Sequence, residues 1–405
     1  MNTGQERINE FVIREKQGRL GMKSEWTKKK LSDIVDFNPR ETIKKGTIAK
    51  KIPMDVLRPF YRDIPYYVEA CFSSGMKFRN GDTIMARITP CLENGKTAQV
   101  SILNDGEVGF GSTEYIVFRA KEGIADKDYL YYLVCSPEVR ELAIKSMVGS
   151  SGRQRVQTDV VKNLEIDVPS LVEQEKIGSF LKAFDDKIAL NDRINKNLAD
   201  LVQTLYKEQF GNISSEDNTG ILSDVCSYSK DKIALSKLNS STYYSTENML
   251  PNKAGVTEAT SLPTMQQTTF CREGDTLISN IRPYFKKILY CDKECGCSSD
   301  VLCFTPTQSR YAAYLFSTLY ADNFFAFMIA GSKGTKMPRG DKQQIMTYPL
   351  VIPSDEELEN FNAIAFPALK QIHSNRTEIK KLSALRDTLL PKLMSGELDV
   401  SGIDL

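Results

Sequence analysis

Two glycine-rich basic loops are the segments of this sequence best suited to bind an anion. The first runs from Gly149 to Val156 and reads Gly-Ser-Ser-Gly-Arg-Gln-Arg-Val, and the second runs from Gly331 to Arg339 and reads Gly-Ser-Lys-Gly-Thr-Lys-Met-Pro-Arg. Glycines let a ligand approach the backbone closely, and the long polar side chains can grip phosphates or reach the edges of guanine and adenine. A solvated turn is the competing interpretation for each residue. The candidate binding residues are Arg87, Lys96, Arg153, Gln154, Arg155, Lys286, Lys287, Lys333, Lys336 and Arg339.

Catalytic chemistry finds little support in the sequence. The only histidine, His373, lies in a long helical pattern, which removes most histidine-based catalysis. The Gly95-Lys96-Thr97 run resembles the end of a phosphate loop, but Pro90 stands where the first glycine is required. The motif Asn/Asp-Pro-Pro-aromatic, typical of amino-methyltransferases, is also absent, so an autonomous enzyme is disfavoured.

A cysteine-rich stretch raises the possibility of a zinc site. Cys291, Cys295, Cys297 and Cys303 lack the paired Cys-x-x-Cys spacing of zinc knuckles. The matching stretch of the first half, residues 107–118, contains no cysteine. We therefore expect these side chains to act as small buried hydrophobes on strands.

The elements that must position the loops occur twice in the chain. Gly81-Asp82-Thr83-Ile84 returns as Gly274-Asp275-Thr276-Leu277, and the run 112–118 returns as 298–304. Gly149-x-x-Gly152 aligns with Gly331-x-x-Gly334. Short β-rich runs at 83–88 and 115–118 are expected to be strands, and 128–142 a helix. The predicted segments are an N-terminal helix (1–25), a first domain (26–168), a first long helix (169–210), a second domain (217–352) and a second long helix (353–398).

Each copy ends in a seam of apolar residues spaced alternately by four and three. This period of about 3.5 residues is the mark of a coiled coil, and two ordinary amphipathic helices are the alternative. The first helix leaves domain one and delivers the chain to domain two, so paired helices must be antiparallel. Asn191 and Asn375 occupy equivalent seam positions, where asparagine fixes register, and we expect them to lie close together. Pro367 is expected to start or kink the second helix.

Composition limits the class of protein further. The 405 residues carry 41% hydrophobic and 26% charged residues, ordinary values for a globular protein. Without an apolar run of about 18 residues, no membrane span is expected, and nine cysteines without a secretory signal favour the cytoplasm. Because the net charge is only +1, a chain that binds nucleic acid needs clustered cations or a partner that supplies part of the attraction.

The whole pattern resembles the specificity (S) subunit of type I restriction-modification systems. The resemblance rests on the loop at 149–156, the Val-Pro-x-Leu-x-Glu-Gln-x-x-Ile run at 168–177 and the C-terminal run at 389–398. It implies two target-recognition domains, each reading half of a bipartite double-stranded DNA sequence. It implies helices that dock two methyltransferase (M) subunits, which carry S-adenosylmethionine, and a motor-nuclease (R) subunit that completes the restriction enzyme. The second copy departs at Lys333-Gly334-Thr335-Lys336 and lacks the Glu-Gln pair after Ile352-Pro353.

We therefore expect a mixed α/β fold with two pseudo-repeated recognition domains separated by an antiparallel coiled coil. The expected function is non-catalytic DNA specificity, with no cofactor bound by this chain. The alternative is a coiled-coil scaffold that binds proteins without reading DNA sequence. Recognised bases and spacer length cannot be deduced from sequence, because side-chain contacts depend on docked geometry and DNA shape.

Overall fold

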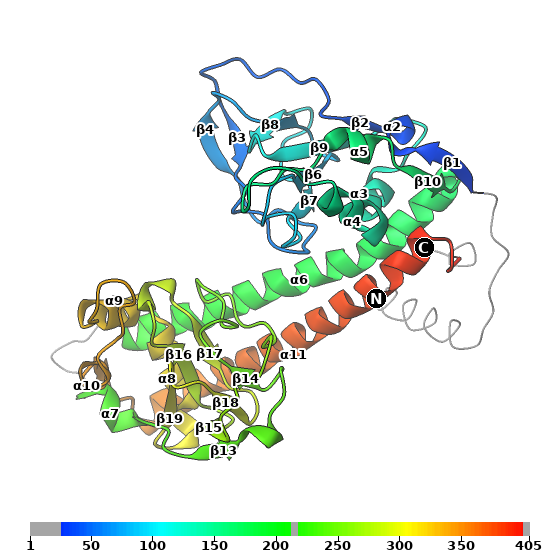
Figure 1. The fold of residues 1–405 in the computed structure, drawn as a ribbon. Coiled ribbons are helices and arrows are strands. Elements are labelled where there is room, and N and C mark those ends of the chain that lie inside the picture. The colour runs from blue at the N-terminus through cyan, green and yellow to red at the C-terminus, as the bar shows by residue number, and fades with distance from the viewer. Residues whose placement is uncertain (1–25, 212–217, 400–405) are drawn as a thin grey trace. The chain divides into compact units, whose positions relative to one another are not determined.

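The computed structural model describes residues 26–211 and 218–399, which form a mixed α/β protein of two compact units (Figure 1). Unit 1 takes the chain up to Asn191 and again from Glu378, and unit 2 comprises Asp192–Thr377. Each of the two long helices is therefore divided between the units. The helix expected over residues 1–25 lies outside the described residues. Among the described residues, no helix is long and apolar enough to cross a membrane.

Unit 1 contains two four-stranded sheets and a short strand pair. The first sheet has the order β2-β9-β6-β7, and the second has the order β4-β3-β8-β5, in which β3 and β8 run parallel. The strands of the first sheet are β2 (Val35–Phe37), β9 (Tyr115–Ala120), β6 (Thr83–Ala86) and β7 (Thr97–Gln99). Those of the second are β4 (Val68–Cys71), β3 (Ile48–Ile52), β8 (Gly109–Gly111) and β5 (Lys77–Phe78). The pair joins β1 (Thr27–Lys30) to β10 (Glu165–Val168).

Unit 2 repeats this plan. Its first sheet has the order β12-β19-β16-β17 and its second the order β13-β15-β18-β14, in which β14 and β18 run parallel. The strands of the first sheet are β12 (Cys226–Tyr228), β19 (Val301–Pro306), β16 (Thr276–Ser279) and β17 (Ile288–Tyr290). The second sheet is built from β13 (Lys232–Ala234), β15 (Gln267–Cys271), β18 (Cys295–Cys297) and β14 (Tyr243–Tyr244), and β11 (Thr219–Ile221) pairs with β20 (Pro349–Val351).

The repeat extends to strand register. Thr83 faces Phe118 in unit 1, and the matching Thr276 faces Phe304 in unit 2. The second sheets diverge at their edges, because β4 extends the β3 edge whereas β13 extends the β15 edge. The sequence repeat is therefore a repeat of folded units that share a scaffold and differ at its margins.

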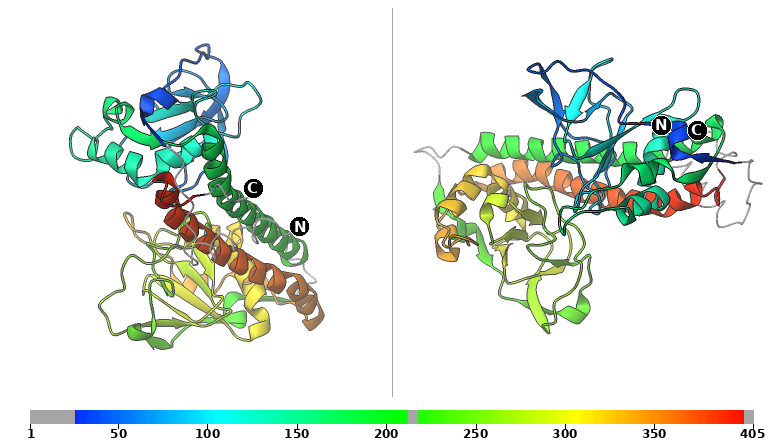
Figure 2. Two further views of the ribbon diagram at one scale, coloured as in Figure 1. Left: turned by 90° about the vertical axis from the view of Figure 1, so that its right-hand side faces the viewer. Right: turned by 45° about the horizontal axis from the view of Figure 1, so that its top comes forward.

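Short helices cover the first sheet of each unit. In unit 1 they are α2 (Leu31–Ile34), α3 (Lys127–Cys135), α4 (Pro137–Lys145) and α5 (Thr158–Lys162), and Figure 2 shows the strands lying to one side of α3 and α4. In unit 2 they are α7 (Leu222–Val225), α8 (Ala312–Tyr320), α9 (Asp322–Ala330) and α10 (Lys342–Ile345), with 3-10 turns η1 (Leu235–Lys237), η2 (Pro283–Phe285) and η3 (Ser309–Tyr311). In unit 1 the β6 strand of the first sheet is buried along its whole length.

The single helix expected over 128–142 is wrong, because the chain forms two helices there. Ser136 adopts an extended conformation between α3 and α4, and Pro137 begins the second helix. The residue before a proline is disfavoured in the helical region, and proline at the first helical position has no amide hydrogen to leave unpaired. The apolar periodicity continued across a break that the proline imposes.

The two long helices, α6 (Leu171–Phe210) and α11 (Asp355–Met394), pair in antiparallel fashion, as the seams predicted. In unit 1 the early part of α6 meets the late part of α11, where the buried Asp185 carboxylate accepts a hydrogen bond from Arg386. In unit 2 the late part of α6 packs against the early part of α11, and Val202 shares a core with Phe361. The expected fold class is confirmed.

The seam asparagines have partners that the sequence did not anticipate. Asn191 donates to the Glu378 carboxylate at 2.7 Å, and Asn375 donates to the Asn195 side-chain oxygen at 2.9 Å. Each is buried and hydrogen-bonded to the opposite helix, so its desolvation is compensated. A role in fixing register stays a prediction. Pro367 does not start the second helix, because α11 begins at Asp355, and a kink at Pro367 stays a prediction.

Candidate nucleic-acid interface

In unit 1 the basic loop closes onto the sheet through Arg155. The backbone of Arg155 bridges both Ile88 and Val148, so the loop from Gly149 to Gln154 projects from a fixed base. The Arg155 Nε–H lies 3.0 Å from both Glu114 carboxylate oxygens, and an Nη2–H donates to one of them at 2.7 Å. This contact lowers the pKa of Glu114 below its ordinary value. A forked guanidinium–carboxylate contact of this kind fixes the plane of the arginine.

Unit 2 builds the same arrangement from different residues. The backbone of Arg339 bridges Ile281 and Lys333, and its Nη2–H donates to the Asp300 carboxylate at 3.2 Å. Asp300 supplies the carboxylate from the turn before β19, the same place from which Glu114 precedes β9 in unit 1. The two units therefore share a guanidinium–carboxylate pair at the base of each loop.

These bridges correct the alignment of the two loops. Gly149 follows Val148 with φ +135°, and Gly334 follows Lys333 with φ +103°, whereas Gly331 ends α9 with φ −88°. Gly334, not Gly331, therefore occupies the place of Gly149. A left-handed φ strains any residue with a Cβ, which explains why both positions hold glycine.

A hairpin lies beside each loop and differs between the units. The backbone N–H of Thr89 donates to Gln154 in unit 1, and that of Arg282 donates to Pro338 in unit 2. Thr89 and Gln154 thus occupy the places that Arg282 and Pro338 hold in the second copy. The two interfaces share a frame but carry different side chains at these positions.

Comparisons with known proteins agree with this architecture. A family model described as the type I restriction modification DNA specificity domain matches residues 23–199. The EcoAI specificity subunit of Escherichia coli is 33% identical over 150 residues, which cover 36% of this chain and 25% of that subunit. The MjaIX specificity subunit of Methanocaldococcus jannaschii is 24% identical over 307 residues, 69% of this chain and 71% of that subunit. The solved S subunit from M. genitalium shares the fold, with a TM-score of 0.55 and 15% identity over 93% of this chain and 96% of its own.

Residues 23–199 of the chain thus match the type I restriction modification DNA specificity domain, and the chain is similar to type I restriction enzyme specificity subunits. The curated relatives are specificity subunits of type I restriction enzymes. The match to the EcoAI subunit spans only a quarter of that subunit's length.

The predicted cations of this chain fall into two groups. Arg153 and Lys336 are exposed at the loop tips. Lys333 instead pairs with Asp341 at 2.6 Å, and Lys286 pairs with Asp322 at 2.9 Å. Arg87 lies 3.8 Å from Glu114, so it belongs to the cluster at the base of the first loop, and Gln154 is half-buried beside Arg155.

Two of the predicted lysines serve the fold. The Lys96 ammonium donates to the Met54 carbonyl at 2.8 Å, and the Lys287 ammonium donates to the Thr246 carbonyl at 2.5 Å. Each lysine directly precedes the second strand of the hairpin beside the basic loop, which is β7 in unit 1 and β17 in unit 2. Burial lowers the pKa of Lys287. These contacts tie the hairpin to a crossing segment, so both ammonium groups are already engaged.

Sequence reasoning missed the two carboxylates that hold the loop arginines. Glu114 and Asp300 stand at equivalent places in the repeated runs 112–118 and 298–304. An acidic residue kept at the same position of both copies was the available signal.

The cysteine stretch of unit 2 forms part of a core. Cys291, Cys295, Cys297 and Cys303 are buried together with Cys271, and the sulfur atoms of Cys291 and Cys295 lie 3.6 Å apart. Among the described residues, no group of three or more histidine, cysteine or acidic side chains is placed to hold a metal ion. The cysteines pack as the small hydrophobes that their spacing favoured.

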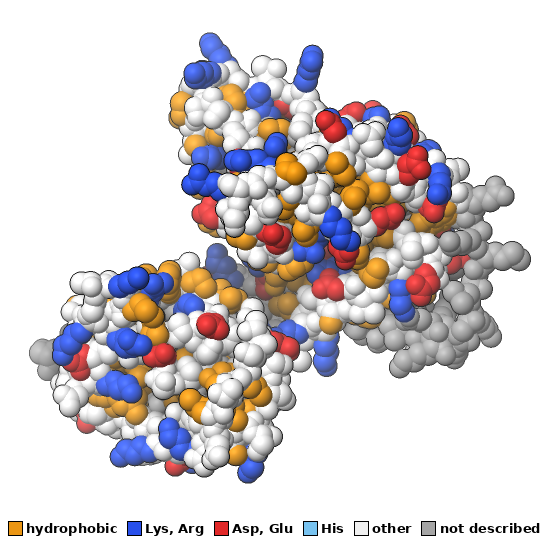
Figure 3. Space-filling model, viewed as in Figure 1, with side chains coloured by type: hydrophobic (Ala, Val, Ile, Leu, Met, Phe, Trp, Pro, Cys, Tyr) orange, Lys and Arg blue, Asp and Glu red, His pale blue; other side chains and the backbone are white. Residues whose placement is uncertain are grey.

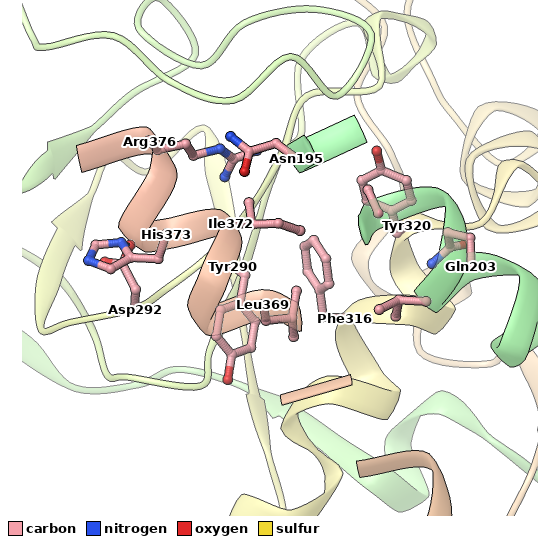
Figure 4. Close-up of a pocket in the computed structure, with 12 residues that line it drawn as sticks. Asn195, Gln203, Tyr290, Asp292, Phe316, Tyr320, Leu369, Ile372, His373 and Arg376 are labelled. Carbon is pink, nitrogen blue, oxygen red and sulfur yellow. The ribbon is translucent and has the colours of Figure 1, made fainter. Parts of the chain in front are cut away.

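A pocket in unit 2 lies away from the basic loops. Tyr290, Phe316 and Tyr320 contribute rings to it, and Arg376 of α11 lies at its edge beside Asn195 of α6 (Figure 4). Burial lowers the pKa of Arg376. None of the residues predicted for DNA binding lines this pocket. It lies where the long helices pack against the rest of unit 2.

Proposed function

We propose that this specificity subunit directs a type I restriction-modification complex to a bipartite double-stranded DNA target, with each unit reading one half. The observation that carries the proposal is the repeated loop base, Arg155 with Glu114 and Arg339 with Asp300, set beside unlike hairpins. A shared frame with different exposed side chains is what two readers of different half-sites require.

The shared and the unlike positions suit different contacts. Phosphates are the same in every sequence, so the common guanidinium groups of Arg155 and Arg339 suit the DNA backbone. Base edges differ between half-sites, so the unlike positions suit base readout. In unit 1 these are Thr89 and Gln154, and Arg282 takes the place of Thr89 in unit 2. Arg153 and Lys336 extend from the loop tips toward either kind of contact.

The methyltransferase partners supply the chemistry in this proposal. Two M subunits would bind S-adenosylmethionine, flip the target adenines and methylate them, while this chain binds no cofactor. Exposed apolar side chains on the long helices support docking of a protein partner there: Leu190 and Leu201 of α6 and Ile364 of α11. An R subunit would complete the nuclease.

A scaffold that binds proteins without reading DNA is the second candidate. It is favoured by the pairing of several loop cations with carboxylates, such as Lys333 with Asp341, which reduces the charge available to DNA. The two functions differ in sequence preference, since a scaffold has none.

Selection from a random double-stranded DNA library tests the proposal. The complex of this chain with its M subunits would be incubated with the library, and the bound DNA sequenced after washing at rising salt. We expect a two-part asymmetric motif that survives higher salt than the bulk DNA. Recovery without any motif would support the scaffold, and a motif obtained with M alone would contradict a specificity role.

A further inference from the structure

In unit 1 an earlier segment of the chain crosses the β6–β7 hairpin. The Phe60 N–H donates to the Gly95 carbonyl at 3.0 Å, and Lys96 holds the carbonyl of Met54 at 2.8 Å. A Cβ on Gly95 would lie 2.6 Å from the Phe60 ring, so the ring packs directly on this glycine. The crossing thus holds one aromatic ring at the hairpin.

Unit 2 repeats the crossing at its β16–β17 hairpin. The Asn252 N–H donates to the Phe285 carbonyl at 2.7 Å, and Lys287 holds the carbonyl of Thr246. Here the hairpin carries the aromatic residues, Tyr284 and Phe285, whose ring centroids lie 4.8 Å apart. The crossing segment carries Lys253 where unit 1 has Phe60, because the Lys253 N–H donates to Lys286, which precedes Lys287 as Gly95 precedes Lys96.

Both units therefore expose an aromatic surface at the same crossing. In unit 1 the crossing segment supplies the ring, and in unit 2 the hairpin supplies it. Phe60 is 54% exposed, Tyr284 48% and Phe285 37%. Exposing a large ring forgoes the stabilisation that its burial in the core would give. The same outcome reached from different segments indicates a common use for an exposed ring rather than an accident of one loop.

The backbone at the crossing is also held in an uncommon conformation. Phe60, Asn252 and Lys286 have φ of 60°, 56° and 49°, in the left-handed region. Residues with a Cβ occupy this region at a cost, and such positions cluster at functional sites. The hydrogen bonds of the crossing hold the strained residues and so fix the direction of the rings.

Charge at the crossings favours an anionic partner. The Arg140 guanidinium lies 5.3 Å from the centre of the Phe60 ring. In unit 2, Lys253 and Lys286 share the single carboxylate of Asp322, at 2.8 and 2.9 Å, which leaves the group positive. Figure 3 shows basic side chains lying among hydrophobic ones on the visible face of unit 2.

We propose that Phe60 in unit 1 and the Tyr284–Phe285 pair in unit 2 stack on nucleobases of the bound DNA. The proposal rests on the proposed function and names contacts that the basic loops do not supply. Aromatic faces stack on any base, and side chains inserted at a base step can hold an opened duplex. An opened duplex is what a base-flipping partner requires. Cations beside exposed rings fit DNA better than an apolar protein surface.

Three variants of the chain in complex with its M subunits test the proposal. Phe60→Leu keeps an apolar side chain on Gly95 but removes the aromatic face, and Tyr284→Ala with Phe285→Ala removes the pair. Tyr66→Ala is the matched control, because Tyr66 is also 54% exposed in unit 1 but takes no part in the hydrogen bonds of the crossing. DNA affinity is measured by fluorescence anisotropy, and base opening by 2-aminopurine placed in each half-site.

We expect each crossing variant to weaken target binding on the order of ten- to a hundredfold and to reduce 2-aminopurine fluorescence in one half-site only. The control and a Phe60→Trp variant should behave as the parent complex does. If the parent complex recognises its target and each crossing variant binds and fluoresces as the parent does, the stacking proposal alone is overturned. Loss of co-purifying M would overturn it in favour of a protein contact. A parent complex without any target preference would instead overturn the proposed function.

Discussion

At the scale of residues, the carboxylate beside each loop-base arginine fixes the orientation of its guanidinium group. Arg155 is partly exposed and contacts Glu114, which is 41 positions away along the chain. In bulk water such a pair contributes little to stability, about 0–1 kcal/mol. Its use is geometric, because the fork holds the guanidinium plane while the remaining N–H groups stay available to DNA.

Replacing these carboxylates should affect the half-sites separately. Glu114→Gln removes the charge that holds Arg155, and we expect a loss of about 1 kcal/mol in binding that is confined to one half-site. Asp300→Asn should do the same for the other half-site. Competition binding with DNA duplexes altered in one half at a time measures both effects. Tighter binding to all DNA by Glu114→Gln would instead mean that the carboxylate only repels the phosphates.

Truncating the loop arginine tests which part of the DNA it contacts. If Arg155 grips a phosphate, Arg155→Ala should cost roughly 1–3 kcal/mol on every sequence of the first half-site and lower the salt slope by about 1. Binding to single-base variants of that half-site at several salt concentrations provides the measurement. Relaxed discrimination at one base pair would assign Arg155 to base readout.

The sequence predicted the positions of these cations but not their engagement. Lys96 and Lys287 looked as available as Arg153, yet both donate to backbone carbonyls of a segment distant in the chain. The position of Phe60 could not be predicted, because its packing on Gly95 depends on a contact between segments that are separate in the sequence. Charge can be read locally, whereas availability depends on tertiary packing.

At the scale of elements, the long helices were the most predictable part of the fold. A seam repeated over many turns leaves few alternatives, and topology then requires antiparallel pairing. The short helices were less predictable: Pro137 divides a pattern whose periodicity runs through it. The partners of Asn191 and Asn375 depended on the exact stagger of two helices, which seam spacing alone does not specify.

A buried ion pair on these helices should be sensitive to loss of one partner. The side chains of Asp185 and Arg386 are 4% and 8% exposed, and Tyr132 also donates to the carboxylate. Burial raises the pKa of Asp185, and Arg386 offsets part of that effect. Arg386→Met leaves a buried carboxylate unpaired and should destabilise unit 1 by roughly 3–5 kcal/mol.

Denaturant unfolding followed by tryptophan fluorescence measures this effect, because the only tryptophan, Trp26, lies in unit 1. Asp185→Leu combined with Arg386→Met should recover much of the loss, since the charges of both partners are removed together. Lys162→Ala, which breaks an exposed pair, is the control and should cost less than about 0.5 kcal/mol. Equal unfolding midpoints for Arg386→Met and the control would contradict the account.

At the scale of the whole molecule, the near-neutral charge constrains how the chain would bind DNA in the proposed function. A net charge of +1 cannot supply a large electrostatic attraction by itself. Duplicated cation clusters attract DNA locally, and the partners would contribute the remaining phosphate contacts.

Salt dependence should therefore separate the chain from its complex. We expect the isolated chain to bind duplex DNA weakly and with a shallow dependence on salt. The complex with M should bind tightly, and the logarithm of its binding constant should fall steeply as salt rises. Titrations of both species at several salt concentrations measure the two slopes. An isolated chain whose slope equals that of the complex would contradict this division of labour.

Mapping N6-methyladenine across the genome of a host that carries the M partner, with and without this chain, tests the central claim most directly. The account predicts a two-part asymmetric methylation motif that is present only when the chain is present. Methylation by active M that follows the same motif, or none, whether or not the chain is present would contradict the assignment of DNA specificity to this chain.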